Sequence, residues 1–120
     1  MPDDDLPDGW QWGGGEANRP LHEGGYYLHV ATNTIWENQY ARRYYEARVD
    51  TANYTQDRGP TKHILIINER IEDFREGTSA DLDHLVTDVV DVDDRNDPEA
   101  QQRAEDEIHE KARMHMEYYT

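Results

Sequence analysis

The strongest constraint on the fold of this chain is its excess of carboxylates, which leaves few apolar side chains to build a core. The sequence has 27 Asp and Glu residues against 12 Lys and Arg residues, and its net charge is −15 over 120 residues. Apolar residues make up only 35% of it. We therefore expect one domain with a modest core, in which Tyr and Trp side chains contribute much of the packing.

The same charge indicates the solvent in which the chain folds. In dilute salt a large net charge destabilises the compact state through self-repulsion, whereas in about 1 M salt the repulsion is screened within roughly 3 Å. We interpret the composition as an adaptation to high salt, as in a haloarchaeon or one of its viruses. The alternative is a DNA mimic, in which the carboxylates take the place of phosphates.

Several classes of protein are not supported by the sequence. There is no Cys, which excludes disulfides, thiolate metal sites and cysteine nucleophiles. No apolar run approaches the roughly 18 residues of a membrane span, and the first residues lack the signature of a signal peptide. The basic residues are scattered, so we expect no direct nucleic-acid binding. We expect the protein in the cytoplasm, in a high-salt cytosol or within a virus particle.

Residues 1–25 differ in composition from the rest of the chain. They are rich in Gly, Pro and acidic residues, which argues against a regular element. Only Trp10-Gln11-Trp12 alternates as a short strand does. We expect an extended arm over 1–25 and a single domain over 26–120.

Two segments have the composition of β-strands. Residues 26–32, YYLHVAT, alternate between two faces, and residues 62–68, KHILIIN, contain four consecutive Ile or Leu residues. Such a run is typical of a strand inside a sheet. We predict that 62–68 is an internal strand.

The stretch 34–49 fits two structures. Helical spacing of aromatic residues from Trp36 onward, preceded by a capping-box pattern of Thr34 and Glu37, favours a helix. As strands, residues 34–38 would return on 26–32, and Tyr45, Ala47 and Val49 would alternate along a further strand. We favour the helix.

Three further helical segments follow from apolar spacing. Residues 69–76 are predicted as a short helix or turn that stops at Gly77. Residues 79–92 are predicted as a helix, because their apolar residues follow the spacing of one buried helical face: Leu82, Leu85, Val86 and Val89. The last helix covers 98–118, with Asp97 as its N-cap and Pro98 as its first residue. Its narrow apolar stripe consists mainly of alanines: Ala100, Ala104, Ile108 and Ala112, followed by His115 or Met116 and then Tyr119.

These elements predict an α+β fold. A small, mainly antiparallel sheet containing 26–32 and 62–68 is covered by C-terminal helices from 79–92 and 98–118. An extended Gly/Pro-rich N-terminal arm precedes it.

No motif for catalysis or for a cofactor emerges. The acidic run 91–97 fails the EF-hand pattern, which requires Gly where Asn96 stands, and the only serine, Ser79, lacks a nucleophile-elbow context. We therefore assign no catalytic, cofactor or metal residue, expect no cofactor and identify no small-molecule substrate. An alternative is a small enzyme or metal-binding protein that uses His29 and His63, which would meet if their strands pair.

The aromatic residues are more numerous than a small core can bury. One explanation is that Tyr replaces large aliphatic residues in a salt-adapted core. The other is an interface, where Trp and Tyr are enriched. The predicted interface residues are Trp10, Trp12, Tyr26, Tyr27, Trp36, Tyr118 and Tyr119. On this basis we expect a non-catalytic structural or adaptor subunit of a larger halophilic assembly, such as a virion connector or tail-joining protein, that acts through protein partners or self-assembly.

Overall fold

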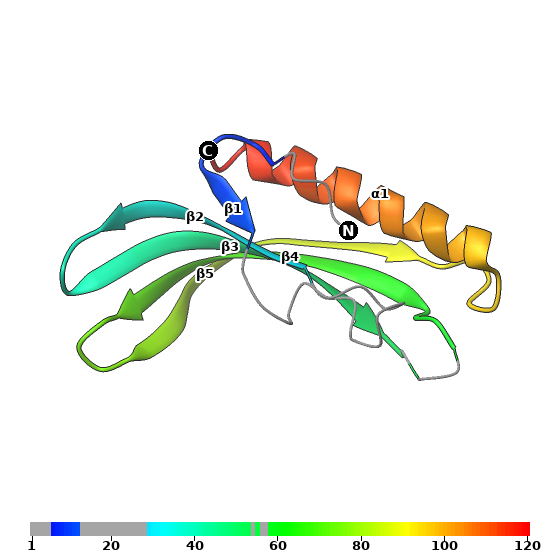
Figure 1. Cartoon of the computed structure of the whole chain (residues 1–120), viewed down its shortest axis with the longest axis horizontal. Coiled ribbons are helices and arrows are strands. Elements are labelled where there is room, and N and C mark those ends of the chain that lie inside the picture. Colours follow the sequence, from blue (N-terminus) through cyan, green and yellow to red (C-terminus); the bar gives the residue numbers. More distant parts are fainter. Residues whose placement is uncertain (1–5, 13–28, 54, 56–57) are drawn as a thin grey trace.

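A computed structural model describes residues 6–12, 29–53, 55 and 58–120. In this part of the chain, five antiparallel strands form one sheet and a single helix follows them (Figure 1). The strands lie side by side in chain order. The elements are β1 (Trp10–Trp12), β2 (His29–Glu37), β3 (Ala41–Ala52), β4 (Lys62–Asp73), β5 (Thr78–Asp91) and α1 (Pro98–Glu117).

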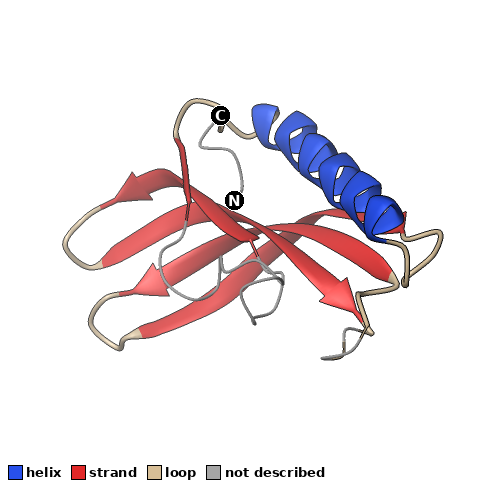
Figure 2. Ribbon diagram, turned by 45° about the vertical axis from the view of Figure 1, so that its right-hand side comes forward, coloured by secondary structure: helices blue, strands red, loops and turns tan. Residues whose placement is uncertain are grey.

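The helix α1 covers one face of the sheet, and among the described residues no helix lies on the opposite face (Figure 2). This arrangement confirms the α+β class and the antiparallel sheet. It corrects the number of covering helices, because the described residues contain only α1. Most of the predicted arm lies outside the described residues, but Trp10–Trp12 pair with Asn33–Ala31 of β2 as an edge strand.

The segment 79–92, predicted as a helix, is instead the edge strand β5. Its pairing with β4 shifts register twice, between Ile67 and Asn68 and between Glu69 and Arg70. Each shift inserts one extra residue, Leu85 and Leu82 respectively. A bulge residue breaks the period-2 alternation of a strand, and two bulges in close succession produce an apolar spacing that resembles that of a helix.

The segment 34–49 contains the end of one strand, a turn and most of the next strand, so the favoured helix is wrong. The strand alternative is right that Tyr45, Ala47 and Val49 alternate along a strand, but residues 34–37 continue the strand that begins at His29 instead of returning on 26–32. β2 continues to Glu37 and β3 begins at Ala41. Tyr45, Ala47 and Val49 lie on one face, toward α1. The pairing of β3 with strands on both of its edges decides this outcome, and these partners are not visible in a local apolar period.

The segment 69–76 is also not helical. β4 continues to Asp73, and a turn then leads into β5. Gly77 closes the turn in a left-handed conformation, with φ of 70°, which glycine adopts without steric cost.

Two predictions from the sequence are confirmed in detail. β4 is internal, between β3 and β5. The helix α1 begins after Asp97, whose side chain accepts a hydrogen bond from the Glu99 backbone N–H at 3.0 Å, and Pro98 is its first residue. The first four residues of the predicted apolar stripe are buried, and Met116 rather than His115 follows them as the fifth buried residue of this helix.

The core lies between α1 and the middle of the sheet. Leu65 and Ile67 on β4 and Ile108 on α1 are completely buried. Cross-strand pairing aligns Ala31, Ala47, Ile67 and Val86 in one row beneath the helix. Small side chains in both layers, including Ala104 and Ala112 on α1, permit a close approach between helix and sheet.

Candidate interaction surfaces

The sheet is longer than the helix that covers it. The ends of the β2–β3 and β4–β5 hairpins project beyond the C-terminal end of α1 (Figure 1). We call residues 34–44 and 69–82 the hairpin lobe. The helix α1 does not cover this part of the sheet (Figure 1).

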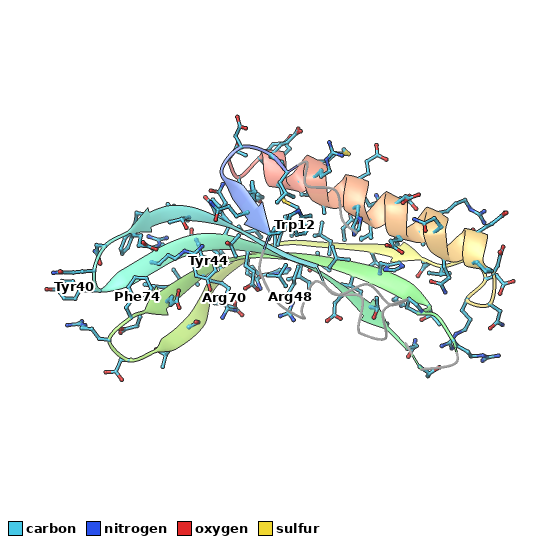
Figure 3. All side chains as sticks on the ribbon, in the orientation of Figure 1. Trp12, Tyr40, Tyr44, Arg48, Arg70 and Phe74 are labelled. Atoms are coloured by element: carbon cyan, nitrogen blue, oxygen red, sulfur yellow. The ribbon has the colours of Figure 1, made fainter. Side chains whose placement is uncertain are left out.

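Large apolar side chains are exposed on the hairpin lobe. Trp36 is 40% exposed, Tyr40 50% and Phe74 41%, and Ile35 and Leu82 are exposed to a similar extent. Figure 3 shows Tyr40 and Phe74 close to the two hairpin ends. Exposed apolar side chains that gather in one region mark interaction sites more often than isolated ones do.

The two hairpin ends are held together and are internally braced. The backbone N–H of Phe74 donates to the carbonyl of Tyr40 at 2.9 Å. The side chain of Asn38 accepts hydrogen bonds from the backbone N–H groups of Tyr40 and Ala41 at 2.8 and 3.0 Å. In the turn between β4 and β5, the side chain of Asp73 likewise accepts two hydrogen bonds from backbone N–H groups. The exposed aromatic residues therefore stand on a preorganised support, which lowers the entropy lost on binding.

On the face opposite α1, the lobe carries a network of charges around Tyr44. The Arg42 guanidinium lies 4.3 Å from the centre of the Tyr44 ring, and Arg70 donates to the Tyr44 hydroxyl at 3.2 Å. Arg70 also pairs with Glu46 and Asp81. Burial alone would lower the pKa of Arg70, but its bond to Tyr44 and the two carboxylates raise it above the ordinary value.

A second charged group joins α1 to the edge of the sheet. Asp88 on β5 lies 3.2 Å from the imidazole of His115 and 3.8 Å from the ammonium of Lys111. Burial would raise the pKa of Asp88, but the bond to His115, the Val89 backbone N–H and the charge of Lys111 lower it. This contact orients the helix on the sheet.

The predicted interface residues fall into different environments. Trp10 is only 5% exposed, and its indole N–H donates to the carbonyl of Met116 at 3.0 Å, so it packs in the core of its own domain. Trp12 and Tyr119 are half-buried against the same core. Trp36 and Tyr118 are exposed, Tyr118 at 88%. Tyr26 and Tyr27 lie outside the described residues.

The packing of Tyr119 connects the end of the chain to the sheet. Its ring lies 5.0 Å from that of Tyr45 on β3, and its carbonyl accepts a hydrogen bond from the buried side chain of Asn33 at 2.6 Å. Trp10 and Tyr119 thus help to fasten α1 to the sheet. Of the predicted interface residues that the structure describes, Trp36 and Tyr118 are therefore the ones exposed to meet a partner.

The alternative of a metal site between His29 and His63 required that their strands pair. β3 lies between β2 and β4, and His29 pairs with Val49 whereas His63 pairs with Thr51. Among the residues that the structure describes, no group of three or more His, Asp or Glu side chains could hold a metal ion. Burial of His63 lowers its pKa to about 4.

Two features of the lobe escaped prediction from the sequence. The exposure of Tyr40 and Phe74 depends on the hairpin ends lying beyond α1. Because the sequence patterns of 34–49 and 79–92 favoured helices, neither hairpin was predicted. The alternation of Arg42, Tyr44 and Glu46 was a usable signal, because a charged and aromatic face with period 2 is typical of a strand with one solvated face.

Comparison with protein-family models, with curated proteins and with solved structures found no match to this chain. The helix of the described part is too polar to cross a membrane.

Proposed function

We propose that this chain is a non-catalytic structural or adaptor subunit of a larger assembly, and that the hairpin lobe is a surface by which it joins its neighbours. The setting we propose is halophilic, in a haloarchaeon or a haloarchaeal virus. A virion connector or tail-joining protein is the concrete candidate.

The observation that carries this proposal is the apolar hairpin lobe. Trp36, Tyr40 and Phe74 are each at least 40% exposed although the chain has few apolar side chains in all. Exposing them on a braced extension, rather than burying them in the core, is favourable if a partner covers them. Trp and Tyr are also the residue types that most often dominate binding energy at interfaces.

The high-salt setting is supported by the charge. A surface with a net charge of −15 opposes association of like subunits in dilute salt, because the repulsion between them is long-ranged. At molar salt the repulsion is screened and the short-range apolar contacts of the lobe can drive assembly.

The test is to replace Trp36 and Phe74 by Ser together and to measure incorporation of the variant into assemblies isolated at high salt. Deleting the arm 1–25 is a poorer test, because Trp10 belongs to the core. We expect W36S/F74S to keep the wild-type circular dichroism spectrum and unfolding midpoint and to be lost from the assemblies.

Met114→Ser is the matched control, because Met114 is 63% exposed on α1 and is not part of the lobe. We expect M114S to be incorporated as the wild type is. Normal incorporation of a folded W36S/F74S variant would exclude the hairpin lobe as the joining surface.

A further inference from the structure

The sheet face opposite α1, which we call the open face, has an apolar centre. Val30 on β2 and Ile66 on β4 pair with Arg48 of β3, and Ile64 of β4 pairs with both Asp50 and Val89. Since residues directly opposite each other in antiparallel strands point to the same side of the sheet, these side chains form one contiguous patch. Ile64 and Ile66 remain partly accessible and Val89 is 44% exposed.

Two opposite charges stand in this patch without an ionic partner among the described residues. Arg48 and Asp50 lie two positions apart on β3 and point to the same side, and no ion pair joins them. The Nε of Arg48 is buried and makes no hydrogen bond. Figure 3 shows Arg48 on the side of the sheet away from α1.

The other arginines of the sheet are arranged differently. Arg42, Arg43 and Arg70 each lie within 4.0 Å of at least one carboxylate of a described residue. Arg48 differs because no carboxylate of a described residue forms an ion pair with it, although Glu46 and Asp50 stand two positions away on the same side of β3. The Nε of Arg43 is also buried without a hydrogen bond, so the feature that distinguishes Arg48 is its missing ion pair, which a carboxylate supplied from outside the chain would provide.

We propose that the open face is the contact surface of a symmetric dimer, in which it packs against the open face of a second copy of this chain. A two-fold axis passing over β3 near Val49 brings the two β3 strands across each other in opposite directions. Arg48 then meets Asp50 of the partner subunit, and Asp50 meets Arg48 of the partner subunit. A symmetric interface has this reciprocal form.

The remaining features of the open face agree with this contact. Two sheets pack face to face about 10 Å apart with interdigitated side chains, and the patch offers Val30, Ile64, Ile66 and Val89 for that layer. The interface would resemble other stable contacts in combining an apolar centre with specific charge pairs. The adjacent network around Tyr44 lies at the rim.

The edge strand β5 is a poorer contact for a second copy. Two bulges interrupt it, and four of its residues are Asp: Asp81, Asp83, Asp88 and Asp91. Bulges and charged side chains on an edge strand oppose pairing with another strand. Pairing between two copies of β5 would also bring aspartates together. The face, rather than the edge, therefore provides complementary chemistry for a second copy.

The test uses charge reversal and light scattering of the full chain at about 3 M KCl, where long-range repulsion is screened. We expect the wild type to show twice the 14.1 kDa mass of the chain. Arg48→Asp places carboxylates opposite each other at both pairs, and Asp50→Arg places guanidinium groups opposite each other. Each single variant should weaken dimerisation at least about 100-fold.

The decisive sample is an equal mixture of the two variants. In a heterodimer of R48D with D50R, each pair again joins opposite charges, so we expect the mixture to recover the dimer mass. Arg58→Asp and Glu76→Arg make the same charge changes at exposed positions outside the open face, and we expect both to remain dimeric.

A monomeric wild type at the highest soluble concentration would overturn the proposal, as would single variants that dimerise like the wild type. A mixture that stays monomeric while both variants are folded would also overturn it. The proposed dimer contact does not use Trp36 or Phe74, so W36S/F74S should still dimerise. Failure of one proposal therefore does not imply failure of the other.

Discussion

Two buried histidines illustrate how the core changes the chemistry of single residues. His63 on β4 is 1% exposed, and burial lowers its pKa from 6.5 to about 4. His109 on α1 is partly buried, and burial lowers its pKa to about 4 as well. Both side chains are therefore neutral in the folded protein well below the pH at which they become charged in the unfolded chain.

These shifts predict a loss of stability in mild acid. As the pH falls from about 6.5 to about 4, the unfolded chain binds protons that the folded chain does not, so the free energy of unfolding decreases. The contribution of His63 would amount to up to about 3 kcal/mol, since one pKa unit corresponds to about 1.4 kcal/mol. Below about pH 4, protonation of His63 causes no further decrease in the free energy of unfolding.

His63→Leu removes that contribution while retaining an apolar side chain of similar size. We expect the free energy of unfolding of H63L, measured by denaturant titration, to fall less between pH 6.5 and pH 4.5 than that of the wild type. Equal decreases in the two proteins would show that His63 titrates normally in the folded state. The same comparison at pH 7 and above should show no pH-dependent difference.

The stability of the packing between α1 and the sheet depends on a layer of small side chains. Alanines from both layers belong to the core: Ala31 and Ala47 on the sheet, and Ala104 and Ala112 on the helix. Protein cores are packed as densely as organic crystals, so a layer of such small side chains leaves no space for a larger one. The alanine stripe therefore sets the distance between helix and sheet.

Ala104→Leu tests this role of the stripe. We expect the variant to lose about 1–3 kcal/mol of unfolding free energy, because the added methyl groups force the helix away from the sheet. Arg103→Leu is the matched control, since Arg103 is exposed on the adjacent position of α1, and its effect should remain within about 0.5 kcal/mol. Denaturant unfolding at constant salt measures both. An unchanged A104L variant would mean that the helix packs more loosely than the structure shows.

Charge is the property that governs the whole molecule. The net charge of −15 is carried by a chain of only 120 residues. Among the described residues, ion pairs such as Arg42 with Glu72 and Arg70 with Asp81 involve only a minority of the carboxylates. Self-repulsion among the rest destabilises the compact state and is weakened by salt. Stability should thus depend on salt throughout the molecule rather than at one site.

We predict that the free energy of unfolding rises as KCl is increased from about 0.2 M to about 3 M. A variant that neutralises four exposed carboxylates should show a smaller increase: E76Q, D83N, E107Q and E110Q combined. Denaturant titration at each salt concentration provides the measurement. If the two proteins respond identically to KCl, the salt effect does not arise from surface repulsion.

Prediction from the sequence succeeded where a signal is local. The cap of α1 depends on Asp97 and its neighbours, and the buried stripe of α1 depends on a spacing within one helix. It failed for 79–92, where bulges at Leu82 and Leu85 imitate a helical period. It also failed for 34–49, whose conformation depends on hydrogen bonds to strands at both edges. The hairpin lobe was missed for the same reason.

The sequence by itself determined the acidic character of the protein, the α+β class, the internal strand β4 and the helix α1, because composition and short-range spacing encode these properties. Only the tertiary structure decided that Trp10 belongs to the core, that Trp36, Tyr40 and Phe74 lie exposed on one lobe, and that Arg48 and Asp50 stand together on an open face. These outcomes depend on strand register and on where one helix ends above the sheet. Both are set by contacts between residues far apart in the chain, which no local pattern contains.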